Sequence, residues 1–321
     1  MTRILLLLVL LLGSILRAAG GSGPERSLER FEYKQYHMGV DVRIVVYARN
    51  SEAAVTACHA AFERFAELDD VMSDYRATSE LMRLCARSGG PPVKVSRDLY
   101  KVLDRAIDVA RRSDGAFDPT CGPLVALWRT ARKTHELPPA DEIAKARALV
   151  GWRNVRLDPR ERTVELLTPG MKLDLGGIGK GFADDCAQVV LKRNGITRAL
   201  VEAGGDIVVS GPPPGRAGWQ IAAPNAGTGA TPPVLSFANC AVSSSGDTEQ
   251  FVEIGGKRYS HIVDPRTGMA LTNRIGVTVV ARDGLTSDGI SKPLSILSED
   301  RRRAFMRYYR GVTVYMRHRT D

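Results

Sequence analysis

Residues 173–185 read LDLGGIGKGFADD, and this stretch combines a β-type run, a cluster of glycines and the start of a helical repeat. The run Met171–Leu175 is strand-like, and four glycines follow it within six residues. Phe182–Asn194 then carries apolar residues at helical spacing, and Gly195 is placed to end that helix. The stretch therefore predicts a strand, a tight glycine turn and a helix.

The glycine turn suits a ligand that bears phosphate. Glycine lets the backbone approach a ligand closely, and the start of a helix offers free N–H groups to an anion. Asp174 and Lys180 lie beside it. The Gly-x-Gly-x-x-Gly fingerprint fails at Phe182, and the P-loop pattern fails because Gly181 follows the lysine. A plain strand-to-helix turn stays open as the alternative.

Strands and helices alternate along the rest of the chain. Periodicity predicts helices over 52–70, 98–112, 141–150 (with Asp141 as N-cap) and 288–307. It predicts strands over 41–47, 163–167, 199–202, 207–210, 219–223, 251–254, 258–262, 275–281 and 312–316. Clustered strands with helices between them, without strict βαβ alternation, favour the α+β class.

The N-terminus has the pattern of a secretory signal peptide. Arg3 precedes an apolar run over residues 4–12, and small residues follow up to Gly21. The run is too short for a confident membrane span, so residues 1–20 are expected to direct export to the periplasm or beyond. An uncleaved anchor, and with it membrane contact, stays open. Lipid attachment is not expected because this region has no cysteine.

Composition narrows the classes of partner and cofactor. The formal net charge is +9, part of it in an arginine-rich C-terminal segment that reads as a solvated surface, so no nucleic-acid partner is expected. Five cysteines lack CxxC spacing, which makes a metal cluster improbable and leaves one disulfide possible.

Several small-residue motifs accompany the glycine turn. Ala203–Asp206 resembles a hairpin turn, Ser243–Asp247 a polar turn after a buried strand, and residues 259–268 (YSHIVDPRTG) a strand end with a sharp turn. Thr286–Lys292 places oxygen donors at the start of the last helix.

Taken in order, these strings resemble the ApbE family, the FAD:protein FMN transferases. The matching segments cover nearly the whole chain after residue 36: 37–39 (HMG), 72–75 (MSDY), 114–119 (DGAFDP) with 122–124 (GPL), 174–185, 201–206 (VEAGGD) and 261–268. The resemblance implies one catalytic domain over residues 31–321, with mostly antiparallel strands. It also implies FAD as substrate, Mg²⁺ as cofactor, and transfer of FMN to a Thr or Ser of a secreted or membrane flavoprotein with release of AMP.

The resemblance assigns a metal site and a flavin site. The metal residues would be Gly177 through its carbonyl, Asp288, Ser291 and Lys292. Asp288 and Ser291 are an i, i+3 pair on one helical face, and a simple helix N-cap stays open for Asp288. Relatives often carry Thr at position 292. A protonated lysine cannot ligate a cation, and contact of its charge with a phosphate stays open as the alternative. The flavin contacts carried over by position are Met38, Tyr75, Ala116, Phe117, Asp118, Asp174, Lys180 and Val263.

Purely structural roles remain open for four of the predicted flavin contacts. Core packing is the alternative for Met38 and Tyr75, and local turn capping for Asp118 and Asp174.

His261 is the expected catalytic residue. Its imidazole is suited to take the proton of the acceptor hydroxyl or to pass one to AMP, with Asp247 and Asp264 as candidates to orient it. Two other functions stay open: an FAD pyrophosphatase that gives FMN and AMP, and a non-enzymatic flavin-binding protein.

Overall fold

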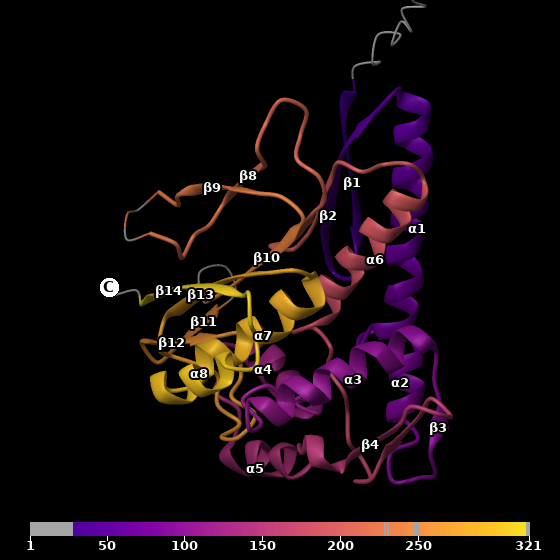
Figure 1. The fold of residues 1–321 in the computed structure, drawn as a ribbon. Helices are drawn as coiled ribbons and strands as arrows, with labels where there is room; N and C mark the ends of the chain where they lie inside the picture. The colour runs from indigo at the N-terminus through magenta and orange to yellow at the C-terminus, as the bar shows by residue number, and fades with distance from the viewer. Residues whose placement is uncertain (1–27, 228, 230, 247–250, 319–321) are drawn as a thin grey trace, which may run out of the picture.

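The centre of the protein is an antiparallel sheet of seven strands (Figure 1). The computed structural model describes residues 28–227, 229, 231–246 and 251–318. The strand order is β1 (Glu29–His37), β2 (Val40–Ala48), β6 (Ala199–Ala203), β7 (Asp206–Val209), β10 (Cys240–Ser245), β13 (Ile275–Ala281), β14 (Thr313–His318). Every adjacent pair runs antiparallel. The predicted α+β class is confirmed.

The two faces of this sheet are covered differently. Helices α1 (Ser51–Met72), α6 (Gly179–Arg193) and α7 (Gly284–Ile296) pack on one face, where Ile44 joins the main core. Its neighbour Val45 points to the opposite face and packs with Trp219 of the hairpin β8 (Trp219–Ala222) and β9 (Val234–Phe237). This inward and outward alternation follows from the two-residue period of a strand.

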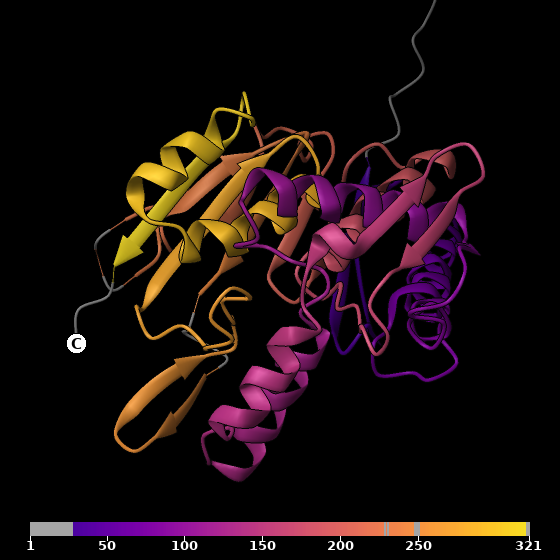
Figure 2. The same ribbon diagram turned by 90° about the horizontal axis from the view of Figure 1, so that it is seen from below.

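A second group of elements lies beside the helical face. Helix α8 (Glu299–Met306) packs beside β14, where Arg302 donates to Met316. The second group contains α2 (Glu80–Cys85), α3 (Arg97–Arg112), the turn η1 (Trp152–Asn154) and a small sheet of β3 (Val93–Lys94), β5 (Thr163–Leu166) and β4 (Val155–Asp158). Helices α4 (Gly122–Thr134) and α5 (Ala140–Ala148) project from it, with the hairpin β11 (Phe251–Ile254) and β12 (Lys257–Ser260) alongside (Figure 2). Trp128 and Tyr259 join α4 to this hairpin, with ring centroids 5.3 Å apart.

The glycine-rich stretch differs from its prediction at both ends. Met171–Leu175 is not a strand: Lys172 forms one isolated bridge with Cys121, and the Asp174 N–H donates to the carbonyl of Pro119, which belongs to a turn, at 2.8 Å. Helix α6 begins at Gly179, so the later glycines form its first turn. Gly195, in the left-handed region at φ 82°, ends the helix as predicted.

The predicted helix over 288–307 is two helices. The backbone is extended at Leu297 and Ser298, which separates α7 from α8. Helix α7 starts at Gly284, and the side chain of Asp283 caps it by accepting from the Thr286 N–H at 2.8 Å. Asp288 therefore lies in the second turn and is not an N-cap.

Two smaller expectations are also wrong. Asp141 lies inside the first turn of α5, which starts after Pro139 without a side-chain cap. Ser243–Ser245 belongs to β10 and not to a turn, because its backbone pairs with β13, and Ser243 also pairs with β7. Asp247 and the predicted signal peptide lie outside the described residues.

Two glycines set the contact between α6 and α7. A Cβ on Gly181 would stand 2.1 Å from the carbonyl oxygen of Gly284, and one on Gly284 would stand 2.3 Å from that of Gly181. Any larger side chain would have to push the two helices apart. This close crossing brings the glycine turn against α7, where the predicted metal residues lie.

The remaining expectations concern cysteines and membrane spans. All five cysteines are free thiols, so the disulfide considered from the sequence is not formed. Over the described part of the chain, no helix has the length and apolar character needed to cross a membrane.

Candidate active site

Asp174 anchors the glycine turn from its N-terminal side. One carboxylate oxygen accepts from the Gly176 N–H at 2.8 Å, and the other accepts from the Arg129 guanidinium at 3.1 Å. Burial raises the pKa of this carboxyl, with the charge of Asp74 adding to the effect and Arg129 opposing it. The carboxylate thus fixes the turn through its backbone, which is the local role left open in the sequence.

Lys180 lies on the first turn of α6 and forms an ion pair with a buried aspartate. Its Nζ is 3.0 Å from Oδ2 of Asp206 and 3.4 Å from the carbonyl oxygen of Gly176. Burial disfavours the ammonium charge, but Asp206 and Asp288 more than offset this, so the pKa of Lys180 is raised. Asp206 reaches this place because the Gly204-Gly205 turn, with both φ values positive, closes the β6–β7 hairpin.

Asp288 and Lys292 form a second ion pair one helical turn apart on α7. The Lys292 ammonium contacts Oδ1 of Asp288, and Oδ2 accepts from the Gly181 N–H at 3.1 Å. Burial alone would raise the pKa of Asp288, but the ammonium groups of Lys292 and Lys180 outweigh it and lower that pKa. Both oxygens of this fully buried carboxylate are engaged.

Asp184 is a further buried acid beside these pairs. It is completely buried, and neither carboxylate oxygen has a hydrogen-bond partner among the described residues. Burial, together with the charges of Asp206 and Asp185, raises the pKa of Asp184 well above its ordinary range. The acids that pair directly with the two lysines are Asp206 and Asp288.

Apolar side chains border the same loop. The Phe117 ring lies 3.2 Å from a Cβ built on Gly177, and the aliphatic stem of Lys292 lies 3.8 Å from it. The methyl carbon of Met38 lies 3.8 Å from a Cβ built on Gly179. The structure therefore brings Met38, Phe117, Gly177 and Lys292 to one glycine loop, as the resemblance implied.

Ala116 and Asp118 are buried in the turn that carries Phe117. Oδ1 of Asp118 accepts from the N–H of Thr120 at 2.8 Å and from its hydroxyl at 2.6 Å, and Oδ2 accepts from the Trp152 N–H at 3.0 Å. Burial raises the pKa of Asp118, although these hydrogen bonds oppose the shift. The observed contacts of Asp118 are those of a turn cap.

Tyr75 is 76% exposed, so it is not a core residue. The Arg129 guanidinium stands 4.3 Å from its ring centroid and also pairs with Asp74 and Asp174. Arg129 thus connects Tyr75 to the glycine turn. Sequence reasoning missed Arg129 because it did not predict helix α4, and it quoted Asp206 within a motif without assigning it a role.

His261 directly follows β12 and is half-buried. Its segment folds back on itself: the Ser260 N–H donates to the Leu271 carbonyl at 2.8 Å, and Val263 bridges Ala270. Val263 packs in the apolar cluster between α4 and the β11–β12 hairpin. These contacts give the histidine a defined place at the end of the hairpin.

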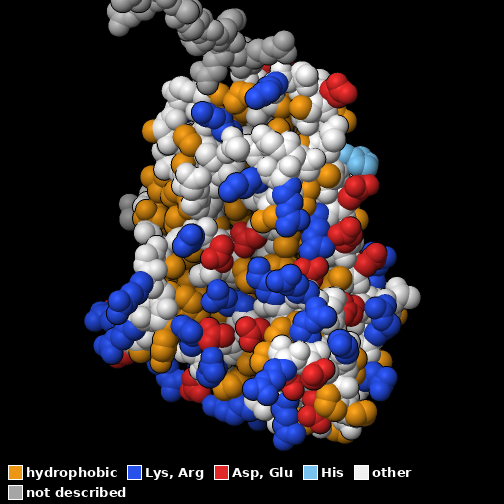
Figure 3. Space-filling model, turned by 45° about the vertical axis from the view of Figure 1, so that its right-hand side comes forward, with side chains coloured by type: hydrophobic (Ala, Val, Ile, Leu, Met, Phe, Trp, Pro, Cys, Tyr) orange, Lys and Arg blue, Asp and Glu red, His pale blue; other side chains and the backbone are white. Residues whose placement is uncertain are grey.

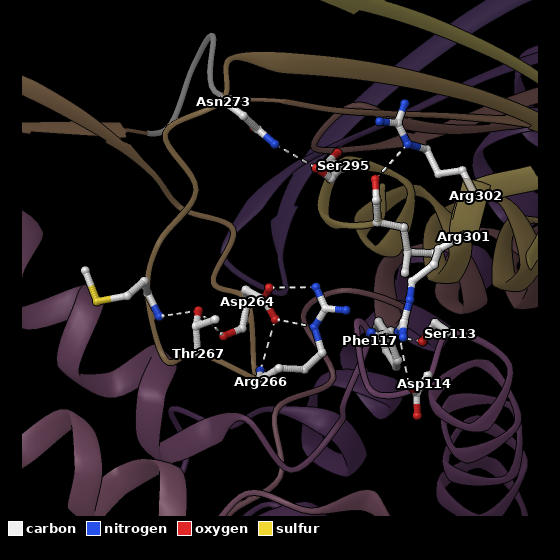
Figure 4. Close-up of polar contacts among 12 residues, drawn as sticks. Ser113, Asp114, Phe117, Asp264, Arg266, Thr267, Asn273, Ser295, Arg301 and Arg302 are labelled. Carbon is white, nitrogen blue, oxygen red and sulfur yellow. Dashed lines mark hydrogen bonds and ion pairs between the residues drawn. The ribbon is translucent and has the colours of Figure 1, made fainter. Parts of the chain in front are cut away.

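The side chain of Asp264 pairs with Arg266, two residues further along the same segment. It accepts from the Arg266 backbone N–H at 3.0 Å and from the guanidinium at 2.9 and 2.8 Å. Figure 4 shows Arg266 between Asp264 and Phe117, and its Cγ lies 4.0 Å from a Cβ built on Gly115. The Asp-Pro-Arg-Thr-Gly turn therefore faces the turn that carries Phe117.

Helix α4 ties the histidine segment to the glycine loop. Trp128 donates from Nε1 to the carbonyl of Gly268 at 2.9 Å, while the next residue, Arg129, donates to Asp174. Two consecutive side chains of one helix thus hold both halves of the candidate site.

The predicted metal ligands do not form a site that fits a resident Mg²⁺. Asp288 is held by Lys292 and Gly181, and the hydroxyl of Ser291 donates to the Asp288 carbonyl at 2.8 Å. Mg²⁺ requires oxygen ligands in near-octahedral geometry, whereas a protonated lysine repels it. Within the described ranges, no group of three His, Cys, Asp or Glu residues is arranged to hold a metal ion.

Surface features lie away from these residues. Two hollows of about 210 and 550 Å³ flank α3 and contain none of the predicted site residues. On the face in Figure 3, Lys and Arg side chains alternate with Asp and Glu and do not form one continuous basic patch. Neither feature supplies a second candidate for the FAD site.

Comparison with known proteins supports the resemblance. The model of the ApbE family matches residues 38–316. The chain is 33% identical over 318 residues to the FAD:protein FMN transferase of Treponema pallidum (strain Nichols), covering 93% of this chain and 87% of that protein. It is 32% identical over 261 residues to the FAD:protein FMN transferase of Klebsiella pneumoniae (strain 342), covering 80% and 79%. The solved flavin transferase ApbE from Vibrio cholerae aligns with a TM-score of 0.81 at 30% identity, covering 92% of this chain and 95% of that one.

Proposed function

The chain belongs to the ApbE family, and we propose that it transfers the FMN part of FAD to a Thr or Ser hydroxyl of a target flavoprotein. The relatives named above are FAD:protein FMN transferases, and the match spans most of each chain. One observation in this structure carries the proposal: two lysine–aspartate pairs, with buried aspartates and partly exposed lysines, meet at the glycine-rich start of α6.

That arrangement suits the diphosphate of FAD. The positive end of the α6 dipole lies at this turn, where the N–H groups of Gly179 and Gly181 already donate to Leu175 and Asp288. Lys180 and Lys292 add two positive charges beside it. Gly176 and Gly177, which precede the helix, have no side chain to keep a phosphate oxygen from the backbone, whereas Gly181 is packed against Gly284. We place the diphosphate at this loop.

Apolar groups beside the loop suit the ring systems of FAD. Phe117 and Met38 lie 3.2 and 3.8 Å from Cβ atoms built on Gly177 and Gly179, and Tyr75 presents an exposed ring on the far side of Arg129. Aromatic and thioether side chains pack favourably on flat ring systems. We assign Met38 and Phe117 to one ring system and Tyr75 to the other.

The proposed reaction forms one bond to phosphorus and breaks another. The acceptor oxygen bonds to the phosphorus of the FMN half while the P–O bond of the anhydride breaks, and AMP leaves with the bridging oxygen. The imidazole of His261 takes the proton of the acceptor hydroxyl. The protein product carries FMN through a phosphoester bond. No atom is oxidised or reduced.

The test uses the full chain, FAD and an acceptor flavoprotein with candidate Thr and Ser residues, with and without Mg²⁺. Intact mass measures covalent flavin on the acceptor, and chromatography measures AMP and FMN. Covalent flavin with an equal amount of AMP supports the proposal. Free FMN with AMP would identify a pyrophosphatase, and bound but unchanged FAD would identify a flavin-binding protein.

We also propose that the reaction takes place outside the cytoplasm. The support is the pattern of Arg3 and the apolar run after it, which lie outside the described residues. Cell fractionation with sequencing of the mature N-terminus tests this. Full-length chain in the cytosol, with Met1 retained, would contradict it.

A further inference from the structure

The Lys292 ammonium lies at the carboxylate of Asp288, where a metal ion bound by this residue would have to lie. Its ammonium contacts Oδ1 of Asp288 and lies 3.4 Å from the backbone oxygen of the same residue. The stem of Lys292 runs along Gly177, while the other oxygen of Asp288 is held by Gly181. The cation paired with Asp288 is therefore the ammonium group of Lys292.

Charge balance points the same way. The buried carboxylates of Asp206 and Asp288 face the ammonium groups of Lys180 and Lys292, so these four side chains sum to zero. A dication added at Asp288 would meet two positive charges and no free carboxylate oxygen on that residue. Charges at such short range in a buried site repel strongly. The free protein is therefore poorly suited to bind Mg²⁺ here.

We propose that the Lys292 ammonium is the fixed cation that contacts the FAD diphosphate, in place of a metal ion bound by Asp288. This inference rests on the proposed function, because it names the group that meets the substrate phosphate. An ammonium group has three N–H donors. Two acceptors for Lys292 are found among the described residues, which leaves one N–H for a phosphate oxygen.

In the transfer step this charge acts on the non-bridging oxygens of the FMN phosphorus. They gain negative charge as the acceptor oxygen arrives and the bond to AMP breaks. A positive charge already in place stabilises that state without reorganisation. Asp288 positions Lys292 and takes no part in bond making.

The first test is metal uptake by the full chain without flavin. Mn²⁺ is titrated in, and electron paramagnetic resonance measures the fraction left free. The wild type should leave Mn²⁺ free, and Lys292→Thr, which removes the charge and adds an oxygen ligand, should bind one ion. Lys145→Thr is the matched control, because Lys145 forms an exposed i, i+4 pair with Asp141 at 2.9 Å.

The second test is FAD affinity in excess EDTA. The wild type and Lys145→Thr should bind FAD equally well with EDTA and with Mg²⁺. Lys292→Met, which keeps the length and removes the charge, should bind about tenfold more weakly or worse.

Several results would overturn the proposal. One is saturable Mn²⁺ binding by the wild type, and another is loss of wild-type FAD binding in EDTA. A third is unchanged FAD affinity in folded Lys292→Met. The two wild-type measurements decide the question even when the variants fail to fold. An acceptor that stays unflavinylated in every condition would count against the proposed function and would leave these binding results unaffected.

Discussion

Replacing Gly181 by Ala should damage both stability and activity. The new Cβ would stand 2.1 Å from the carbonyl oxygen of Gly284 and 2.8 Å from Cβ of Asp288, so α6 and α7 must move apart. Forced overpacking of this kind costs about 1–3 kcal/mol.

The same movement weakens contacts that join the two helices. Asp185 accepts from the N–H groups of Gly284 and Leu285 at 2.7 and 2.9 Å, and the Gly181 N–H donates to Asp288 at 3.1 Å. Each lost bond costs about 1 kcal/mol, and the better helix propensity of Ala returns about 1 kcal/mol. If all three bonds are lost, the free energy of unfolding should therefore fall by about 3–5 kcal/mol.

Urea unfolding followed by circular dichroism measures this change. Gly179→Ala is the control, because its Cβ would meet Met72 and Met38 at ordinary distances of 3.7 and 3.8 Å. That variant should match the wild type or exceed its stability by up to about 1 kcal/mol. A Gly181→Ala protein as stable as the wild type, with full transfer activity, would refute the reasoning about the crossing.

Three further predictions concern single side chains. His261→Ala should lower FMN transfer at least about 100-fold and leave FAD affinity unchanged, as calorimetry and rate assays with His135→Ala as control would show. Burial raises the pKa of Asp185 to about 6, so the folded state holds this proton more tightly than the unfolded state. Stability should fall by about 3 kcal/mol as pH rises from about 3 to 7, and Asp185→Asn should remove that part of the urea-measured profile. Arg129→Met leaves the buried Asp174 carboxyl without its cation and should destabilise the fold by about 2 kcal/mol, whereas an unchanged urea midpoint would contradict the role given to this pair.

The elements predicted correctly from the sequence are those whose secondary structure is specified by their own local residue pattern. Helix α1 has apolar residues at the 3.6-residue spacing of a helix, and strand β13 is a continuous apolar run typical of a buried strand. Both lie close to their predicted bounds. The β6–β7 hairpin was predicted from Gly204-Gly205, because only glycine adopts two successive positive φ values easily.

Elements determined by distant contacts were not predicted. The segment before Gly176 looked like a strand, but it pairs with the turn after Asp118. Helix α6 starts at Gly179, earlier than predicted, and Gly181 in its first turn packs on Gly284, about 100 residues away along the chain. The break between α7 and α8 likewise has no strong local signal.

The candidate site shows the same division. The motifs identified the glycine loop, Asp288 and Lys292, and the structure brings them together with Phe117 and Met38. The pairing of Lys180 with Asp206 depends on two elements separated in sequence, so periodicity and local motifs carried no sign of it. Contacts of His261 with the glycine loop stay a prediction.

Covalent flavinylation of an acceptor is the most direct test of the central claim. The full chain is incubated with FAD and an acceptor flavoprotein, and the intact mass of the acceptor is followed together with the amount of AMP. The account predicts one FMN on a Thr or Ser for each AMP released by the wild type, and neither product with His261→Ala. AMP and free FMN in equal amounts, with an unmodified acceptor, would contradict it.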